Sequence, residues 1–270
     1  MHCLFSGMIK QHGRKAHRGI MNNIKKGIFI VAVLFLAVSC AASRAKKKED
    51  SGAHYRLGVA HLNDRNYSEA LKELTTAVEM YPDDPSYHNG LGLAYFARSM
   101  NKEAIAQFKE AVRLDPKFSD AYLHLSAVYL SEKRWDEAIA VDDAAVKNIF
   151  YRTPELAYLN RGLAYFGKGD YKTAFESFRK AIEFNAKYTP AYYHMGLALD
   201  KMNALRDSIE AFKTAVSLDD AYVEAHYSLG LAYIKLKNKG EALKAFEKVI
   251  TLAPQTDMAL SARDYINLLK

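Results

Sequence analysis

Histidines and paired carboxylates are the residues of this chain that could carry acid–base chemistry or hold a metal. Six of the nine histidines follow residue 40, namely His54, His61, His88, His124, His194 and His226. They show no HxxxH spacing, and the chain has no CxxC, so no metal-binding motif is present in the sequence. The acidic pairs are typical of solvated helix ends and are Asp83-Asp84, Asp142-Asp143 and Asp219-Asp220. We therefore expect a chain that is not an enzyme and that uses no cofactor and no metal.

Cys40 is the residue with the clearest expected covalent chemistry. It ends the segment KKGIFIVAVLFLAVSC, in which two lysines precede an uninterrupted apolar run of 12 residues, Gly27 to Val38. As a helix this run would be about 18 Å long, short of the roughly 30 Å hydrocarbon core of a bilayer. The length favours a secretory signal over a membrane span, and Ser39 supplies the small residue that signal cleavage needs.

The ending Leu36-Ala37-Val38-Ser39-Cys40 resembles the lipobox of bacterial lipoproteins, although Ala37 stands where leucine is usual. The resemblance implies cleavage before Cys40, a diacylglycerol on its thiol and a further acyl chain on its freed amine. Two or more chains hold a protein stably at a membrane, at about 0.8 kcal/mol per buried methylene. The alternative is an ordinary cleaved signal with a coincidental cysteine.

These patterns divide the amino-terminal part of the chain into three segments. Residues 1–20 are interpreted as an upstream extension from a start codon assigned too early, and 21–39 as the signal peptide. Residues 40–50 are interpreted as a charged tether. Ala41 follows the cysteine where inner-membrane lipoproteins of enteric bacteria favour aspartate, so we expect anchoring at the periplasmic face of the outer membrane.

The charge of the chain is concentrated in the segment that we expect to be removed. The whole chain has a formal net charge of +7, but residues 1–40 contain six basic and no acidic residues. Beyond them 32 basic and 31 acidic residues remain. A nearly neutral mature protein does not fit nucleic-acid binding, and we expect no nucleic acid and no small-molecule substrate as partner.

A repeat dominates the rest of the sequence. Small residues recur at spacings of 34, 34, 36, 34 and 34, at Gly58, Gly92, Ser126, Gly162, Gly196 and Gly230. A second series of small residues follows twelve positions later in each unit, from Ala70 to Ala242. We expect each glycine to face an alanine, so that two helices approach closely beside the aromatic residue that follows. Proline stops the second helix because it lacks the N–H donor, as at Pro82, Pro116 and Pro254.

These positions resemble the tetratricopeptide repeat (TPR) pattern. The resemblance implies an all-α fold, a right-handed α-α superhelix of six helix pairs followed by a C-terminal capping helix. The six repeats span 51–256, as 51–84, 85–118, 119–154, 155–188, 189–222 and 223–256. The capping helix covers 257–270 and has Leu260, Tyr265, Ile266 and Leu269 on one side.

In TPR proteins the first helix of each pair lines a concave face that binds peptides or partner helices. Carried over by repeat position, the groove would comprise Tyr55, Val59, Leu62, Asn89, Leu93, Phe96, Leu123, His124, Leu130, Leu159, Leu163, Phe166, Tyr193, His194, Leu197, Tyr227, Leu231 and Ile234. This groove is apolar and aromatic and lacks the basic residues that grip a peptide carboxylate. It predicts a protein ligand with apolar side chains, either an amphipathic helix or an extended segment. The alternative is that the residues in it are core.

Repeat three is irregular. Two residues are inserted after it, Asp142 replaces the expected phenylalanine, and the junction carries Tyr151, Pro154 and Glu155. This junction, the lipobox and the number of repeats resemble the type IV pilus biogenesis lipoproteins of the pilotin type. The resemblance implies a lipid-anchored scaffold that helps a pilus secretin reach the outer membrane and assemble. Two alternatives stay open, a general adaptor for outer-membrane assembly factors or peptidases and an activator of cell-wall enzymes.

Overall fold

A computed structural model describes residues 44–147, 151 and 153–270, so the expected signal peptide and Cys40 lie outside the described residues. The regular structure in these ranges is helical. A helix over 44–63 is followed by α2 (Tyr67–Met80), α3 (Pro85–Ala97), α4 (Asn101–Leu114), α5 (Ser119–Ser131), α6 (Trp135–Val146), α7 (Pro154–Gly167), α8 (Tyr171–Phe184), α9 (Thr189–Lys201), α10 (Leu205–Leu218), α11 (Val223–Lys235), α12 (Lys239–Leu252) and α13 (Asp257–Leu269).

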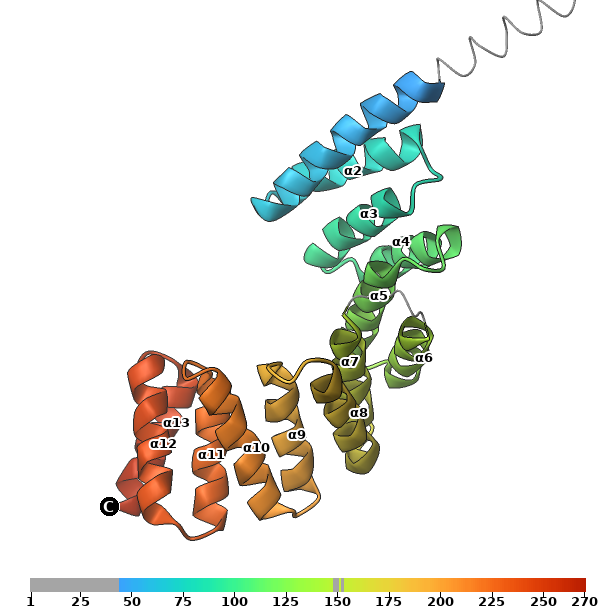
Figure 1. Cartoon of the computed structure of the whole chain (residues 1–270). Helices are drawn as coiled ribbons and strands as arrows, with labels where there is room; N and C mark the ends of the chain where they lie inside the picture. The colour runs from blue at the N-terminus through green and yellow to red at the C-terminus, as the bar shows by residue number, and fades with distance from the viewer. Residues whose placement is uncertain (1–43, 148–150, 152) are drawn as a thin grey trace, which may run out of the picture.

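The helices form six antiparallel pairs that stack into a curved solenoid, with α13 after the last pair (Figure 1). We call the helix over 44–63, α3, α5, α7, α9 and α11 the first helices, and the even-numbered helices the second helices. The expected six-pair architecture is confirmed. Residues 44–50, which the sequence analysis assigned to a tether, are helical and exposed.

A tight turn joins the two helices of every pair. One residue in each turn has a positive φ, and these residues are Arg65, Ser99, Lys133, Gly169, Asn203 and Lys237. The backbone N–H of the next residue donates a hydrogen bond to a carbonyl oxygen of the first helix, as that of Met100 does to Tyr95 at 2.9 Å. A left-handed residue other than glycine costs about 1 kcal/mol, so these bonds hold a strained turn at five of the six positions.

The glycines face large side chains of the second helix. A Cβ added to Gly92 would lie 2.6 Å from the ring of Phe108, and the corresponding contact at Gly162 with Phe178 is 2.3 Å. Gly58 faces Leu74 in the same way. The expected packing of a large side chain beside the glycine is therefore confirmed. The alanines of the second series, which are fully buried, let the second helix come close, and the glycine leaves room for the ring between the helices.

Repeat three replaces this ring-on-glycine contact with a buried polar pair. The Ser126 hydroxyl donates to Oδ2 of Asp142 at 2.8 Å, and Asp142 is fully buried in the middle of α6. Its Oδ1 has no hydrogen-bond partner in the described structure. The interpretation of Asp142 as part of a solvated helix end is therefore wrong, because the repeat turns this position towards the core.

The two helices of each pair occupy opposite sides of the curve. Among the described residues, successive first helices contact one another from α3 to α5, α7, α9 and α11, whereas successive second helices make no comparable contact. Helices crowd on the inside of a curved stack and diverge on the outside. The first helices therefore line the concave face, and the second helices form the convex face.

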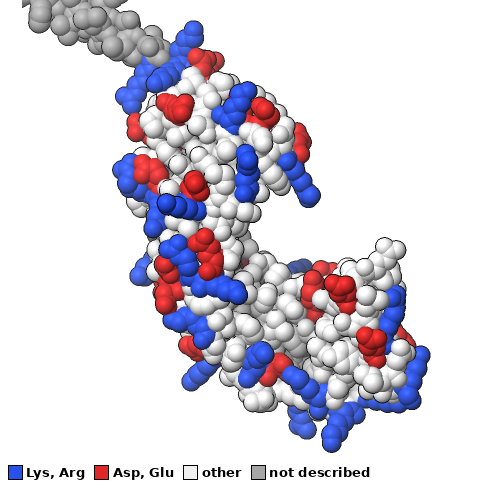
Figure 2. All heavy atoms as spheres, turned by 180° about the vertical axis from the view of Figure 1, so that it is seen from behind, with Lys and Arg blue, Asp and Glu red and all other residues white. Residues whose placement is uncertain are grey.

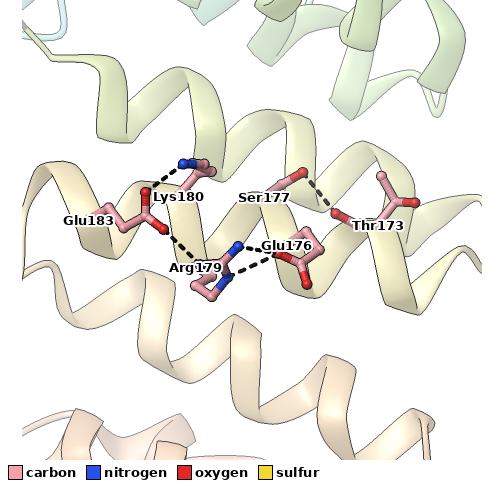
Figure 3. Close-up of polar contacts among 6 residues, drawn as sticks. All are labelled: Thr173, Glu176, Ser177, Arg179, Lys180 and Glu183. Atoms are coloured by element: carbon pink, nitrogen blue, oxygen red, sulfur yellow. Dashed lines mark hydrogen bonds and ion pairs between the residues drawn. The ribbon is translucent and has the colours of Figure 1, made fainter.

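Charged side chains concentrate on the convex face. Figure 2 shows a largely white inner side of the arc and blue and red side chains along its outer side. On α8, Arg179 bonds both Glu176 and Glu183, and Lys180 bonds Glu183 at 2.6 Å (Figure 3). Pairs three residues apart, such as Glu110 with Arg113, occur on other second helices. Such exposed pairs contribute at most about 1 kcal/mol each, so they solvate this face more than they stabilise it.

The last helix, α13, covers the open end of the sixth pair. Ala262 and Ile266 are buried against α12, and Tyr265 stacks on Phe246 with ring centroids 5.1 Å apart. Leu260 is 54% exposed, so its predicted place on the packed side is wrong. About two residues in each turn between 258 and 269 pack inward and form one side of α13. Leu260 lies on the other, exposed side of the helix.

Candidate partner-binding groove

The residues expected to form the groove lie on the first helices and are half-buried, with the exception of Asn89, which is buried. The groove residues of each repeat pack their inner sides against the core of that repeat. Tyr55, Val59 and Leu62 pack on the core around Leu74, and Leu159, Leu163 and Phe166 pack on the core around Phe178. Partial exposure is what a ligand-contacting wall requires, because a fully buried side chain has no free surface. Which of these residues touch a partner stays a prediction.

The groove of repeats five and six contains a pocket of about 290 Å³. The structure brings the predicted residues Leu197, Leu231 and Ile234 together here, and Phe212 and Tyr265 complete the apolar wall. Ligand pockets in proteins are commonly apolar, with a few polar groups that fix orientation. This pocket has the size and lining to take a large apolar side chain.

An ion pair stands at the edge of this pocket. The Lys235 ammonium donates to both carboxylate oxygens of Asp200, at 2.6 and 2.7 Å, across α11 and α9. Lys235 is not among the groove residues predicted from the sequence. A signal was available, because Asp200 replaces an apolar residue at one repeat position and Lys235 follows that same position in the next repeat. The pair fixes the spacing of two first helices beside the pocket.

An aromatic cluster lies next to the pocket. Tyr193 contacts Tyr222 and Phe212, with ring centroids 5.1 and 6.0 Å away. Burial raises the pKa of Tyr193, and a side-chain hydrogen bond with Ser228 opposes that shift. Tyr227 meets Phe246 edge-on at 5.8 Å. The cluster holds these rings in place, so that little conformational entropy is lost when a ligand packs against them.

Two histidines place neutral polar groups in the groove. His124 Nδ1 donates to Oδ1 of Asn89 at 2.8 Å, which joins α5 to α3. Burial lowers the pKa of His124 and lowers that of His194 to about 4. His194 stacks on Phe178 and meets Tyr193 edge-on. Both imidazoles are therefore uncharged near neutral pH, and the groove offers a ligand hydrogen bonds without charge.

The other predicted groove residues continue this wall along repeats two and three. Leu93, Phe96 and Leu130 pack against the buried core of Phe108 and Val128, and Leu123 is half-buried on α5. No group of three or more His, Cys, Asp or Glu side chains within the described residues has the arrangement of a metal site. None of the helices that the structure describes is long and apolar enough to span a membrane.

Three histidines outside the groove, His54, His88 and His226, bond to the second helices or to the repeat junctions. His54 Nδ1 lies 2.6 Å from a carboxylate oxygen of Glu73. His88 bonds the side chain of Gln107 and the carbonyl oxygen of Pro82, and His226 bonds the carbonyl oxygen of Asp220. These contacts tie first helices to their neighbours, which is a structural role.

Models of the tetratricopeptide repeat family match residues 41–85, 55–117, 95–148, 156–188 and 223–255, and a model described as TPR repeat matches 201–237. Together they cover well over half of the chain. No curated protein sequence matches it.

Similar solved structures include two proteins of type IV pilus biogenesis. PilW, described as a widely conserved type IV pilus biogenesis factor, has a TM-score of 0.72 at 17% identity, over 79% of this chain and 98% of that chain. PilF of Pseudomonas aeruginosa has a TM-score of 0.70 at 17% identity, over 81% of this chain and 99% of that chain. YrrB, a TPR protein with an unusual peptide-binding site, has a TM-score of 0.54 at 22% identity, over 71% of this chain and 97% of that chain. At these identities the likeness shows the fold.

Proposed function

This chain belongs to the tetratricopeptide repeat proteins, and we propose that it is a lipid-anchored periplasmic scaffold that assists the localisation and assembly of a type IV pilus secretin. The TPR fold supports a protein-binding adaptor role. TPR proteins are generally scaffolds without catalytic activity. The lipid anchor, the outer-membrane location and the secretin are the parts that the proposal adds.

The observation that carries the proposal is the apolar pocket in the concave groove of repeats five and six. The charged residues of the second helices lie on the other side of the solenoid, so the groove is the surface that loses least solvation when a partner covers it. Burial of one leucine or phenylalanine side chain in such a pocket favours binding by about 1.5–3 kcal/mol. Several such contacts along the groove would hold a segment of a partner protein.

The pilus assignment draws on the fold and on the sequence together. PilW and PilF match this chain over nearly their whole length, so the resemblance extends beyond a few shared repeats. The lipobox-like ending at Cys40 and the irregular junction around Tyr151 point in the same direction. At 17% identity these structures support the fold alone, and the pilus role is an inference from all of these features.

A deletion strain tests the secretin role. The strain should fail to assemble the secretin multimer at the outer membrane, and the intact gene should restore assembly. Leu231→Arg places a charge in the pocket and should restore it poorly. Ser217→Arg adds the same charge to an exposed position on the convex α10 and should restore it fully. Normal secretin assembly in the deletion strain would refute the role.

The anchor has a separate test. Cys40→Ala removes the thiol that would receive the lipid, so the protein should move from the membrane fraction to the soluble periplasmic fraction. The wild-type chain, labelled with a radioactive fatty acid in growing cells, should carry the label and the variant should not. A Cys40→Ala protein that stays in the outer membrane would contradict lipid anchoring, without bearing on what the groove binds.

A further inference from the structure

The amino-terminal turns of the first helix carry a concentrated basic face. Arg44, Lys46, Lys47 and Lys48 lie within five residues, and all are exposed. Arg44, Lys47 and Lys48 stand three and four residues apart, so they share one side of the helix. Glu49 and Asp50 follow directly, and the helical period places Glu49 on the opposite side.

These basic side chains are available to an external anion. In the described structure none of the three residues Arg44, Lys47 and Lys48 forms an ion pair. The Lys48 ammonium lies 5.7 Å from the ring centroid of Tyr81, which holds one end of the basic face against the first repeat. Ser51 lies on the same side of the helix and is buried. Its hydroxyl lies 3.3 Å from the hydroxyl of Tyr87. The helix is thus fixed to the solenoid while its basic end projects beyond α2 (Figure 1).

The position of this face in the chain identifies the kind of partner. Arg44 lies four positions after Cys40, and four such steps along the chain span at most about 14 Å. A lipid on Cys40 would therefore keep the basic face close to the membrane surface. Electrostatic attraction to anionic headgroups acts over about one Debye length, roughly 8 Å at physiological salt.

We propose that the face formed by Arg44, Lys47 and Lys48 binds phosphate groups of anionic lipids in the membrane that holds the anchor. A second attachment next to the lipid would fix the direction in which the solenoid leaves the membrane, because the first helix packs rigidly on α2 and α3. The inference rests on the proposed lipid anchor for its biological setting, but the binding itself needs no lipid on the protein.

A vesicle experiment with unlipidated protein tests this proposal. Residues 41–270 are suitable, because the core clusters of the solenoid are built from residues 55–269. Co-sedimentation is measured with vesicles of phosphatidylcholine and with vesicles in which a third of the lipid is phosphatidylglycerol. We expect binding to the anionic vesicles alone, and we expect it to fall steeply between about 0.1 and 0.5 M salt. Equal partitioning to both kinds of vesicle would overturn the proposal.

Two triple variants separate a specific face from a general charge effect. Arg44→Gln/Lys47→Gln/Lys48→Gln should weaken binding to the anionic vesicles at least about tenfold, since each basic residue near such a surface contributes about fivefold. Lys201→Gln/Arg206→Gln/Lys239→Gln removes the same charge from exposed positions in the carboxy-terminal half and should bind like wild type. Equal loss in both variants, or no loss in the first, would overturn the proposal. Neither result depends on secretin assembly or on acylation of Cys40.

Discussion

Raising the pH from about 5 to about 8 should selectively destabilise the third repeat, because Asp142 must stay protonated while it is buried. Burial is the main cause that raises the pKa of Asp142 to about 8, and the charge of the neighbouring Asp143 contributes in the same direction. The Ser126 hydroxyl and Arg161 act in the opposite direction. Burial raises the pKa of the nearby Tyr151 to about 12, and the charge of Asp142 contributes to that shift. Only the ionised form of Asp142 is disfavoured by this site, so folding and proton binding are coupled.

The sign of the effect follows from the two pKa values. In the unfolded chain the carboxyl has its ordinary pKa of 3.8, whereas in the folded protein it is about 8. Below about pH 4 both states are protonated and the contribution of Asp142 to stability is fully present. Above that pH the unfolded state loses its proton first, so the free energy of unfolding falls by about 1.4 kcal/mol per pH unit. The loss reaches about 4 kcal/mol by pH 7 and levels off above pH 8.

Asp142→Asn is the perturbation that isolates this coupling. Asparagine keeps the size of the side chain and an oxygen that can accept from Ser126, but it does not titrate. Other groups change stability equally in both proteins, so their contribution cancels in the difference. Relative to the variant, the wild-type protein should lose about 1.4 kcal/mol of unfolding free energy for each pH unit between about 5 and 8.

The assay needs a probe inside repeat three, because repeat arrays do not always unfold in one step. Trp135 is suitable, since it is the only tryptophan of the chain and begins α6, the helix that carries Asp142. Its fluorescence is followed during urea denaturation at a series of pH values for both proteins. Parallel stability curves over this pH range would refute the reasoning and would mean that Asp142 is ionised in the folded protein.

Two further predictions concern the packing between paired helices. Gly92→Ala places a methyl group against the ring of Phe108 and should cost about 1–3 kcal/mol in urea denaturation. At Gly240 in α12 the nearest atom to an added Cβ is 4.0 Å away, so Gly240→Ala should be neutral or stabilising by up to about 1 kcal/mol. Ser126→Gly/Asp142→Phe restores the ring-on-glycine contact of the other repeats. It should raise the urea midpoint reported by Trp135, because an apolar ring replaces a carboxyl oxygen that has no hydrogen-bond partner. A lower midpoint would contradict this account of repeat three.

The sequence predicted the fold well because six units repeat nearly the same local pattern. A small residue, a second small residue twelve positions later and, in three of the units, a proline after the second helix together define one helix pair. The stacking of pairs then follows, since a single pair cannot bury its apolar surface alone. The large side chain beside the glycine was also predicted, whereas its distance was not, because periodicity places a residue on a face without showing how closely a facing side chain approaches.

The features that the sequence analysis missed depend on single side chains. Asp142 looked like one half of an exposed acidic pair, but its neighbour Asp143 takes the more exposed side of α6. The pair of Asp200 and Lys235 joins residues 35 positions apart, and only the superposition of neighbouring repeats brings them together. The groove positions could be inferred by repeat number, whereas the pocket arises from side chains of both helices in a pair and from α13.

The central claim, that the concave groove holds a protein partner, is tested most directly by photocrosslinking in cells. A photoreactive phenylalanine derivative at Tyr193, beside the pocket of repeats five and six, is compared with the same residue at Ser217 on the convex α10. The account predicts one discrete adduct from position 193, with a partner that mass spectrometry identifies as a pilus secretin. The same adduct should be absent when the photoreactive residue stands at position 217. A groove position that gives no adduct, while the convex position does, would contradict the account.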